Sequence, residues 1–455
     1  MHKYMRLLSE LEAFIQSGAF GQSGKLPSIR MLAEQHQCSK STVIEALEEL
    51  ERRHVIYSVP RSGYYVVQTS SKRQIKGAQR IDFAASAPDP DVFPYLDFQH
   101  CINKAIDTYK NDLFIYGTAS GLPSLLTVLH KQLAGMQVFA PERNMVITSG
   151  VQQALALLAA IPFPNGKRTV LIEQPGYHLF IEHLLTHQIP VRGIARTAAG
   201  VDMEELERLF RTGDIKFFYT MPRFHSPLGS SFTNQQKKQI AALARKYDVY
   251  VAEDDYMADM EQDSKADPMH AYDRAERVIY LKSYSKIIFP GLRVGLAVLP
   301  EALVGVFRHY KRTMDIDSSM LSQGALEIYL KSGMFDRHRQ KIRQSYTRRA
   351  ELLAAALEQE AAGSGGAFSY TASKQPGMHT HLVLDESIRV PNMISRLHKK
   401  AVLLETIDKH YLPLFQMGNL LKLNVSNVQE PDIEPGIRLL AGELRREWTK
   451  RGSRH

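Results

Sequence analysis

The chain has few cysteines, one tryptophan and no long apolar run. With only Cys38 and Cys101 in 455 residues, a disulfide framework and a cysteine metal cluster are excluded, and a reducing compartment is expected. The longest apolar run, residues 154–163, contains Pro162 and is about half as long as a membrane-spanning helix. The first residues form an amphipathic pattern, which is not that of a signal peptide. We therefore expect a cytoplasmic protein that does not enter a membrane.

Positive charge is concentrated near the N-terminus. The formal net charge is +9, and residues 1–80 carry 12 Lys and Arg against 7 Asp and Glu. A basic N-terminal fifth points to a polyanionic partner, although many solvated surfaces are also basic. The length of the chain and its 44% apolar content are enough for two or three buried cores.

The first 67 residues have the pattern of three short helices and a hairpin. Apolar residues at helical spacing mark a first helix over residues 4–15, and Ser28 and Ser39 stand where the N-caps of two further helices are expected. Residues 55–59 and 64–67 alternate like two strands around a Pro-Arg-Ser-Gly turn. Three small helices followed by a hairpin predict a winged helix-turn-helix domain.

Such a domain places the start of its third helix in the major groove of double-stranded DNA. Short hydroxyls and a lysine at that start can reach phosphates and base edges. We predict DNA contacts from this helix, the preceding helix and the wing, at Ser39, Lys40, Ser41, Thr42, Arg30, Arg61 and Gly63. A small helical docking domain with ordinary caps is the alternative.

This segment resembles the GntR-type winged helix in residues 25–33, 39–43 and 61–66. The resemblance implies that the chain binds a DNA operator. Ile44 stands where the family often has arginine, and His54 stands where it often has glycine. One expected DNA contact is therefore missing, and we expect a different base preference.

Residues 68–80 (QTSSKRQIKGAQR) are polar and basic without periodicity. This composition predicts a flexible tether, with a solvated helix as the alternative. The predicted organisation is a DNA-binding domain over residues 1–67, a linker over 68–80 and a large domain over 81–455. The basic residues 445–455 are expected to be disordered.

From residue 81 onward, helical patterns alternate with short β-branched or aromatic runs, at residues 146–148, 170–172, 217–219, 249–251 and 278–280. This alternation is typical of the α/β class, in which helices cover a mainly parallel sheet. Ligands of such sheets bind beyond the carboxyl ends of the strands. The residues with the most distinctive chemistry follow these runs.

The most informative stretch is residues 283–293, which contain Ser283, Ser285, Lys286 and Arg293. An amine forms a Schiff base with an aldehyde, and hydroxyls together with a guanidinium hold a phosphate dianion. The spacing therefore predicts a site for a phosphorylated aldehyde cofactor, with Lys286 as its reactive group.

Two further segments suit the same cofactor. Ser149 and Gly150 follow a strand and precede a helix that starts at Val151, and free amides at a helix start favour a phosphate. A plain strand–helix turn is the alternative. Asp254 directly follows another strand, where its carboxylate can pair with a protonated pyridine nitrogen. A solvated acidic turn over residues 253–255 is the alternative.

Two tyrosines lie close to these segments in sequence. Tyr256, two residues after Asp254, can hydrogen-bond the oxygen on the cofactor ring. Tyr177 follows a Gln-Pro-Gly turn and can stack on the ring. Its alternative role is that of a loop aromatic at the edge of the core.

Together these pieces resemble the fold-type I pyridoxal-phosphate aminotransferases over roughly residues 81–444. The best matches are residues 283–293, 253–256 and 147–153. The resemblance implies pyridoxal 5'-phosphate as the cofactor, Lys286 as its Schiff-base lysine and a smaller C-terminal α+β subdomain. It also implies that Tyr116 reaches the phosphate bound by a partner subunit.

Two departures from the family lie on the substrate side. Within residues 221–229, where aminotransferases place an asparagine against the ring oxygen, this chain has Phe224-His225, and His225 is the predicted ring contact. Lys422 stands where the family usually has the arginine that grips the substrate α-carboxylate. Because lysine has no planar fork, we expect weaker or differently oriented amino-acid binding, unless Lys422 is a plain surface residue at a strand end.

A GntR-type winged helix joined by a linker to an aminotransferase-like domain is the architecture of the MocR/GabR-type transcriptional regulators. The resemblance implies a cofactor-dependent regulator that forms a head-to-tail homodimer. Three hypotheses stay open: sensing of an amine or amino acid through Lys286, sensing of the cofactor itself, and a working aminotransferase with an accessory DNA-binding domain. Any effector must bind two states with different affinity in order to shift them.

Overall fold

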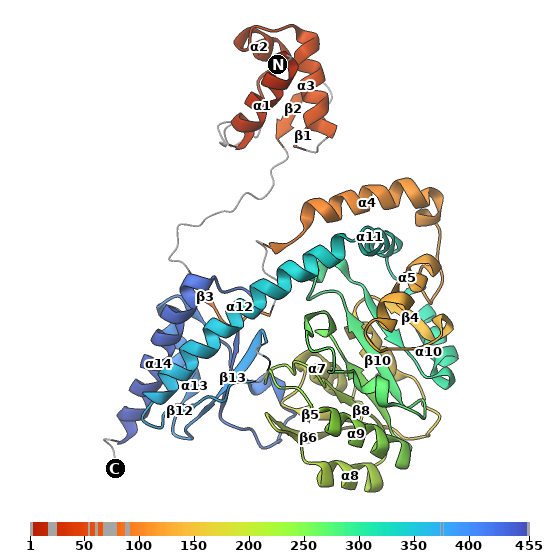
Figure 1. Ribbon diagram of the computed structural model, residues 1–455, viewed down its shortest axis with the longest axis vertical. Coiled ribbons are helices and arrows are strands. Elements are labelled where there is room, and N and C mark those ends of the chain that lie inside the picture. Colours follow the sequence, from red (N-terminus) through yellow and green to blue (C-terminus); the bar gives the residue numbers. More distant parts are fainter. Residues whose placement is uncertain are drawn as a thin grey trace. The chain divides into compact units, whose positions relative to one another are not determined.

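The computed structural model describes residues 3–16, 25–52, 55–59, 62–66, 80–86, 92–373, 375 and 377–452. The chain divides into two compact units, Met1–Ala78 and Gln79–His455, which are described separately (Figure 1). The predicted wing residue Arg61, the family departure at His54 and most of the predicted tether lie outside the described residues.

The first unit has the predicted order of helices and strands. Its described elements are α1 (Lys3–Gln16), α2 (Ile29–Gln35), α3 (Lys40–Arg52), β1 (Ile56–Val59) and β2 (Gly63–Val66), and the two strands pair antiparallel. Ser28 Oγ accepts from the Met31 amide at 3.2 Å, and Ser39 Oγ accepts from the Thr42 amide at 3.1 Å. Both predicted helix caps are therefore confirmed.

A single apolar cluster holds these elements together. Leu11 of α1 packs with Leu47 and Leu50 of α3 and with Ile56 of β1, and all four side chains are buried. A unit of this size has little other apolar area to bury, so each of these side chains matters for its stability.

The large unit is built on a mainly parallel sheet. Within the described chain the strands follow the order β4-β11-β10-β9-β8-β5-β6-β7. β10, β9, β8, β5 and β6 are parallel neighbours, whereas β11 runs antiparallel to β10 and β4. The strands are β4 (Met145–Thr148), β5 (Thr169–Gln174), β6 (Val191–Thr197), β7 (Gly200–Val201), β8 (Ile215–Thr220), β9 (Tyr250–Asp254), β10 (Val278–Ser283) and β11 (Gly295–Val298). The five predicted strand runs and the α/β class are confirmed.

Helices cover both faces of this sheet because its strands are apolar on both sides. In β8, Phe217 and Tyr219 pack with α6 and α7, whereas Phe218 between them packs with α8 and α9. The helices of this part are α4 (Tyr95–Tyr109), α5 (Pro123–Ala134), α6 (Val151–Ala160), α7 (His178–Thr186), α8 (Met203–Thr212), α9 (Asn234–Lys246), α10 (Glu301–Asp315) and α11 (Met320–Lys331).

The C-terminal part forms a smaller α+β layer, coloured blue in Figure 1. β12 (Phe368–Ser369), β13 (His379–Leu384) and β15 (Leu420–Asn424) form a sheet, and β14 (Val402–Leu403) pairs with β3 (Ile81–Asp82). The helices α12 (Met334–Ala362), α13 (Val390–Lys399) and α14 (Glu430–Gly452) complete this layer. Because α14 continues to Gly452, the expectation of disorder is wrong for residues 445–452.

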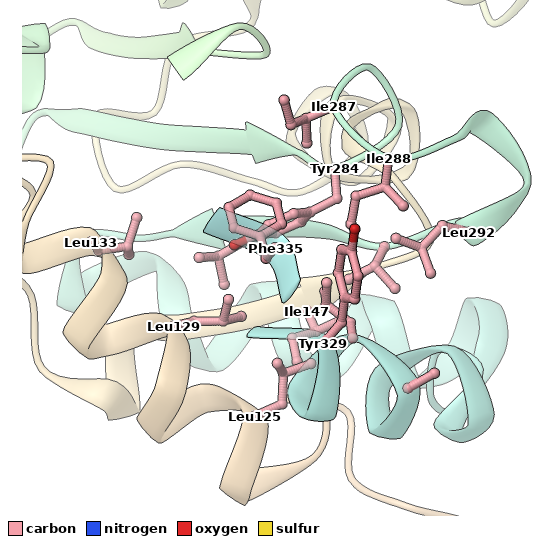
Figure 2. Packing of buried hydrophobic residues seen from close by; sticks show 14 of the residues in the cluster. Leu125, Leu129, Leu133, Ile147, Tyr284, Ile287, Ile288, Leu292, Tyr329 and Phe335 are labelled. Atoms are coloured by element: carbon pink, nitrogen blue, oxygen red, sulfur yellow. The ribbon is translucent and has the colours of Figure 1, made fainter. Parts of the chain in front are cut away.

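The loop after β10 is anchored in a second apolar cluster, which Figure 2 shows from close by. The loop side chains Tyr284, Ile288 and Leu292 pack there with α5, α11 and α12, through Leu125, Leu129, Leu133, Tyr329 and Phe335. The Tyr284 hydroxyl also donates to Gln132 Oε1 of α5 at 2.6 Å. The position of this loop is thus fixed by buried apolar area, not only by the strand that precedes it.

The separation into two units predicts a local effect of a core substitution. Leu47→Ala removes a fully buried side chain of the first unit and should destabilise that unit by about 2–5 kcal/mol. The large unit should keep its stability because it has its own core. Differential scanning calorimetry of the full chain should show an earlier transition for the first unit only, and Met31→Ala, at an exposed site on α2, should change little. A shift of all transitions together would contradict the prediction.

Candidate functional site

Strand ends bring the predicted site residues to one edge of the large sheet. β4 ends at Thr148, directly before Ser149, while β9 ends at Asp254 and β10 ends at Ser283. Because β4, β9 and β10 run in the same direction, their carboxyl ends meet at the same edge. Lys286 lies three residues beyond β10, in the anchored loop.

Lys286 carries an amine with unusual properties. Burial, together with the charge of Lys422, lowers the pKa of Lys286 to about 8. Its Nζ donates to the carbonyl oxygen of Ser86, and the Ser86 hydroxyl accepts from Asn424 Nδ2 at 3.2 Å. About a tenth of this amine is therefore uncharged, and nucleophilic, at pH 7. Ser86 is a neighbour that the sequence patterns did not identify.

Among the described residues, Asp254 has one carboxylate oxygen with a side-chain partner and one oxygen without a hydrogen-bond partner. Oδ2 accepts from the Tyr219 hydroxyl at 2.8 Å, but buried Oδ1 has no hydrogen-bond partner within the described ranges. Burial raises the pKa of Asp254 to about 7. A buried unpartnered oxygen is costly for a protein unless a ligand uses it. The oxygen is suited to a protonated ring nitrogen.

Two tyrosines surround this carboxylate. Burial, and next the charge of Asp254, raise the pKa of Tyr177 to about 12, and the positive charge of Arg293 acts against the shift. The Tyr256 hydroxyl donates to the Phe224 carbonyl at 2.7 Å. Tyr177 is therefore electrostatically coupled to both Asp254 and Arg293, whereas Tyr256 is held by the loop after β8.

The start of α6 and Arg293 form the opposite end of the site. Gly150 precedes Val151, the first residue of α6, with φ 88°, and Arg293 Nη2 donates to the Ser149 carbonyl at 2.5 Å. A Cβ atom on Gly150 would lie 2.7 Å from Arg293 Nη2. The guanidinium could shift away from such a Cβ, but the positive φ at this helix start favours glycine. First-turn amides and a guanidinium together favour a phosphate.

The predicted serines make local contacts. Ser149 Oγ lies 3.2 Å from Ser318 Oγ and 3.3 Å from Asp315 Oδ2. Ser283 Oγ accepts from the Ser285 amide at 3.2 Å. These hydroxyls are close to the helix start and the lysine loop, but a phosphate would have to compete for the Ser149 hydroxyl.

His225 faces a buried carboxylate. Its Nε2 lies 3.3 Å from Glu173 Oε2, and Glu173 Oε1 accepts from Arg196 Nη1 at 3.0 Å. Burial lowers the pKa of His225, while Glu173 acts in the opposite direction. The described contacts of His225 are thus with this ion pair, and its contact with a cofactor ring stays a prediction.

Lys422 is not a plain surface residue, because it is only 8% exposed. On β15 it stands opposite His381 of β13, and Asn424 stands opposite His379. Since alternate residues of a strand share a face, these four polar side chains belong to one face of the small sheet. Leu421 and Leu423 belong to the apolar core on the other face.

Six of the seven residues predicted to contact DNA lie in the described part of the first unit, and Arg61 lies outside it. Lys40 and Ser41 are exposed in the first turn of α3, and Arg30 is exposed on α2. Ser39 Oγ also lies 2.7 Å from Ser41 Oγ, so the Ser39 hydroxyl serves the helix cap. Gly63 begins β2 with φ 114°.

Two other classes of site are missing from the described part of the chain. It contains no group of three or more His, Cys, Asp or Glu side chains that could hold a metal ion. None of its described helices is both long and apolar enough to cross a membrane.

The lowered pKa of Lys286 predicts how its reactivity depends on pH. Covalent attachment of pyridoxal 5'-phosphate should speed up as pH rises through about 8, because the uncharged amine is the nucleophile. Lys422→Ala removes a like charge and should move the midpoint to higher pH. Absorbance stopped-flow measurements would give the midpoints, with Lys286→Ala as the blank and Lys399→Ala, an exposed lysine on α13, as the matched control. A wild-type midpoint near that of an ordinary lysine would contradict this account.

Comparisons with known proteins give matches for both units of the chain. Residues 79–438 match the family model for aminotransferase class I and II, and residues 3–66 match that for bacterial regulatory proteins of the gntR family. The chain is 59% identical over 444 residues to the uncharacterized HTH-type transcriptional regulator YcxD of Bacillus subtilis (strain 168), a match that covers 98% of this chain and 100% of that protein.

Other relatives match the large unit. Aromatic-amino-acid aminotransferase 1 of Thermococcus litoralis is 26% identical, over 81% of this chain and 89% of its own length. The crystal structure of Pyrococcus horikoshii kynurenine aminotransferase has a TM-score of 0.74 and 26% identity, and the match covers 82% of this chain and 92% of that chain. The chain thus belongs to the aminotransferase class I and II family and, because a GntR-type unit precedes that fold, to the MocR/GabR-type transcriptional regulators.

Proposed function

We propose that this protein is a cytoplasmic transcriptional regulator that binds operator DNA with its first unit and pyridoxal 5'-phosphate with its large unit. The observation that carries the cofactor assignment is the pair formed by the buried, unpartnered Oδ1 of Asp254 and the amine of Lys286 with its lowered pKa. The described contacts of Asp254 and Lys286 give no structural reason for placing a buried carboxylate and a reactive amine at one edge of the sheet.

The residues present fit this cofactor from end to end. Lys286 would hold it covalently, Asp254 would accept from the ring nitrogen, and Tyr177 would cover the ring. Arg293 and the helix start at Gly150 would bind the phosphate. When bound, the cofactor supplies an aldehyde carbon that exchanges reversibly between primary amines.

Further cofactor contacts are proposed on weaker structural support. Val151 would contribute an amide, and Ser149, Ser283 and Ser285 would contribute hydroxyls or amides at the phosphate end. Tyr256 would approach the ring oxygen after giving up its bond to Phe224. His225 would use its Nδ1, which has no hydrogen-bond partner among the described residues.

DNA binding is proposed for the start of α3. Lys40 and Ser41 are exposed there, Thr42 is beside them, and Arg30 supplies a further positive charge from α2. The match to the gntR family covers all of these residues, and its members' fold places this helix in the major groove.

A head-to-tail homodimer would use the surface around Tyr116. Tyr116 is 79% exposed and Ile115 is 64% exposed, and the N-terminal end of the preceding helix α4 exposes Tyr95 and Leu96. Exposed apolar side chains that gather into a patch mark interaction surfaces, and these four residues are candidates for one. A second chain would cover them, and Tyr116 would then be available to the partner's phosphate end.

A working aminotransferase is the second candidate. It is favoured by the retention of Lys286, Asp254 and Arg293, which are all that reversible amine exchange requires of the protein. It is disfavoured by Lys422, since a lysine lacks the bidentate grip that would orient an α-amino acid. Release of a keto acid with repeated turnover would decide for this candidate.

The proposed DNA contact makes a quantitative prediction. Lys40→Ala should weaken binding of the full-length protein to operator-length double-stranded DNA by about tenfold and reduce the slope of log affinity against log salt by about 1, because one phosphate contact is lost. Fluorescence anisotropy on DNA selected from a random-sequence pool measures both quantities. Lys399→Ala is the matched control from the large unit. Undiminished affinity in Lys40→Ala, or no sequence preference in the wild type, would oppose the proposal.

A further inference from the structure

The ammonium of Lys422 already has a carboxylate partner within the chain. Lys422 Nζ lies 3.2 Å from Glu405 Oε2, and the same oxygen accepts from Lys409 Nζ at 2.6 Å. Burial alone would raise the pKa of Glu405, but the hydrogen bond from Lys409 and the charge of Lys422 lower it. Glu405 is therefore ionised at neutral pH and shared between two lysines.

This ion pair lies beside the reactive amine. Asn424, two residues from Lys422 on the same face of β15, donates to the Ser86 hydroxyl at 3.2 Å, and the Ser86 carbonyl accepts from Lys286 Nζ. Burial, and next the charge of Lys422, lower the pKa of Lys286. The charges of both Lys422 and Glu405 also act on His178, at the start of α7. Through its ion pair with Lys422, the Glu405 carboxylate lies at the face of the small sheet that also carries Asn424, next to Ser86 and Lys286.

The segment that carries Glu405 is fastened to the large sheet. His410 Nδ1 pairs with the Gly176 carbonyl at 2.8 Å, and the Gly176 amide donates to the His410 carbonyl at 2.8 Å. The Leu412 amide donates to Gln174 Oε1 at 2.5 Å. Because the backbone on the C-terminal side of Glu405 is held in this way, its carboxylate is presented by a fixed segment instead of a free loop.

The neighbouring histidines do not add positive charge for a ligand carboxylate. The rings of His178 and His410 lie 5.1 Å apart, and burial lowers their pKa values to about 4 and about 3. His178 Nδ1 and His410 Nε2 are buried and have no hydrogen-bond partner in the described chain. Both imidazoles are neutral and can hydrogen-bond an uncharged group.

We propose that the site beside Lys286 selects primary amines that lack a carboxylate on the carbon bearing the amino group, in preference to α-amino acids. An α-carboxylate directed at Lys422 would have to compete with the Glu405 carboxylate, which already pairs with this ammonium at 3.2 Å. The ligand carboxylate would have to displace Glu405 from Lys422, and the displaced Glu405 carboxylate would still lie close to the ligand carboxylate. An amine without this group leaves the Lys422–Glu405–Lys409 ion pair intact. This inference rests on the proposed binding of pyridoxal 5'-phosphate at Lys286.

The test compares ligands that differ in the group on the carbon bearing the amine, which is absent in the first, an uncharged ester in the second and a carboxylate in the third. Tyramine, L-tyrosine methyl ester and L-tyrosine would be titrated into the cofactor-loaded full-length protein, with absorbance and isothermal titration calorimetry as readouts. Free pyridoxal 5'-phosphate with the same amines corrects for their intrinsic reactivity. We expect half-saturation with tyramine and the ester at a concentration at least about tenfold lower than with tyrosine, the effect of one unfavourable charge contact.

A charge-neutral substitution isolates the carboxylate. Glu405→Gln should improve tyrosine binding by about tenfold and change tyramine binding by less than about twofold, because only the like-charge contact is removed. Glu386→Gln, at an exposed carboxylate of the same C-terminal layer, is the matched control and should alter neither. The double substitution of Glu405→Gln with Lys422→Arg should favour tyrosine further, since the guanidinium then offers its two parallel hydrogen bonds to the ligand.

Equal binding of tyrosine and tyramine by the wild-type protein would overturn the inference, whether or not the variants fold. A complete lack of response by all three ligands, with the cofactor attached and DNA binding intact, would also overturn it and would leave the proposed function standing. Failure of the cofactor to attach to Lys286 would instead refute the proposed function itself.

Discussion

The buried carboxylate of Asp254 is the constraint on which the candidate site depends. Parallel pairing of β8, β9 and β10 places it at the sheet edge, and one of its oxygens is held by Tyr219 of β8 while the other is unpartnered among the described residues. The position of Lys286 follows from the next strand and from the apolar cluster that anchors its loop. A ring would satisfy both Asp254 and Lys286 if its basic nitrogen faced the carboxylate and its aldehyde lay within reach of the amine.

The charges around Lys286 decide which amines can react with the aldehyde of such a ring. Burial and the charge of Lys422 lower the pKa of Lys286, and Lys422 itself forms an ion pair with Glu405 at 3.2 Å. The amine of Lys286 is therefore reactive, whereas the ammonium of Lys422 is paired with a carboxylate. In a regulator this division is useful, because binding energy then depends on the substituents of an amine and not on a carboxylate common to all amino acids.

Local patterns predicted much of this site, and long-range contacts explain what they missed. The helix caps Ser28 and Ser39, the strand runs and the position of Lys286 follow from short stretches whose chemistry is local. The pairing of Lys422 with Glu405 could not be predicted, because the two residues come from different elements that meet only in the folded subdomain.

The same reason applies to two other residues of the large unit. Tyr219 reads in the sequence as one more buried aromatic of a strand, although its hydroxyl orients Asp254. His225 was placed by analogy with relatives, and its contact with Glu173 depends on a buried charge that comes from β5. Helix α14 extends to Gly452 in spite of its basic end, since its apolar face packs on the small sheet.

The most direct test of the account is whether an amine changes DNA binding through Lys286. Fluorescence anisotropy measures the affinity for selected double-stranded DNA of the cofactor-loaded wild-type protein and of Lys286→Ala. Each protein is titrated with and without tyramine, so that an effect that depends on Lys286 is distinguished from a direct effect of tyramine on DNA binding. The account predicts that tyramine changes the affinity of the wild-type protein for DNA and leaves that of Lys286→Ala unchanged. The same change in both proteins, or none in the wild type although tyramine binds, would contradict it.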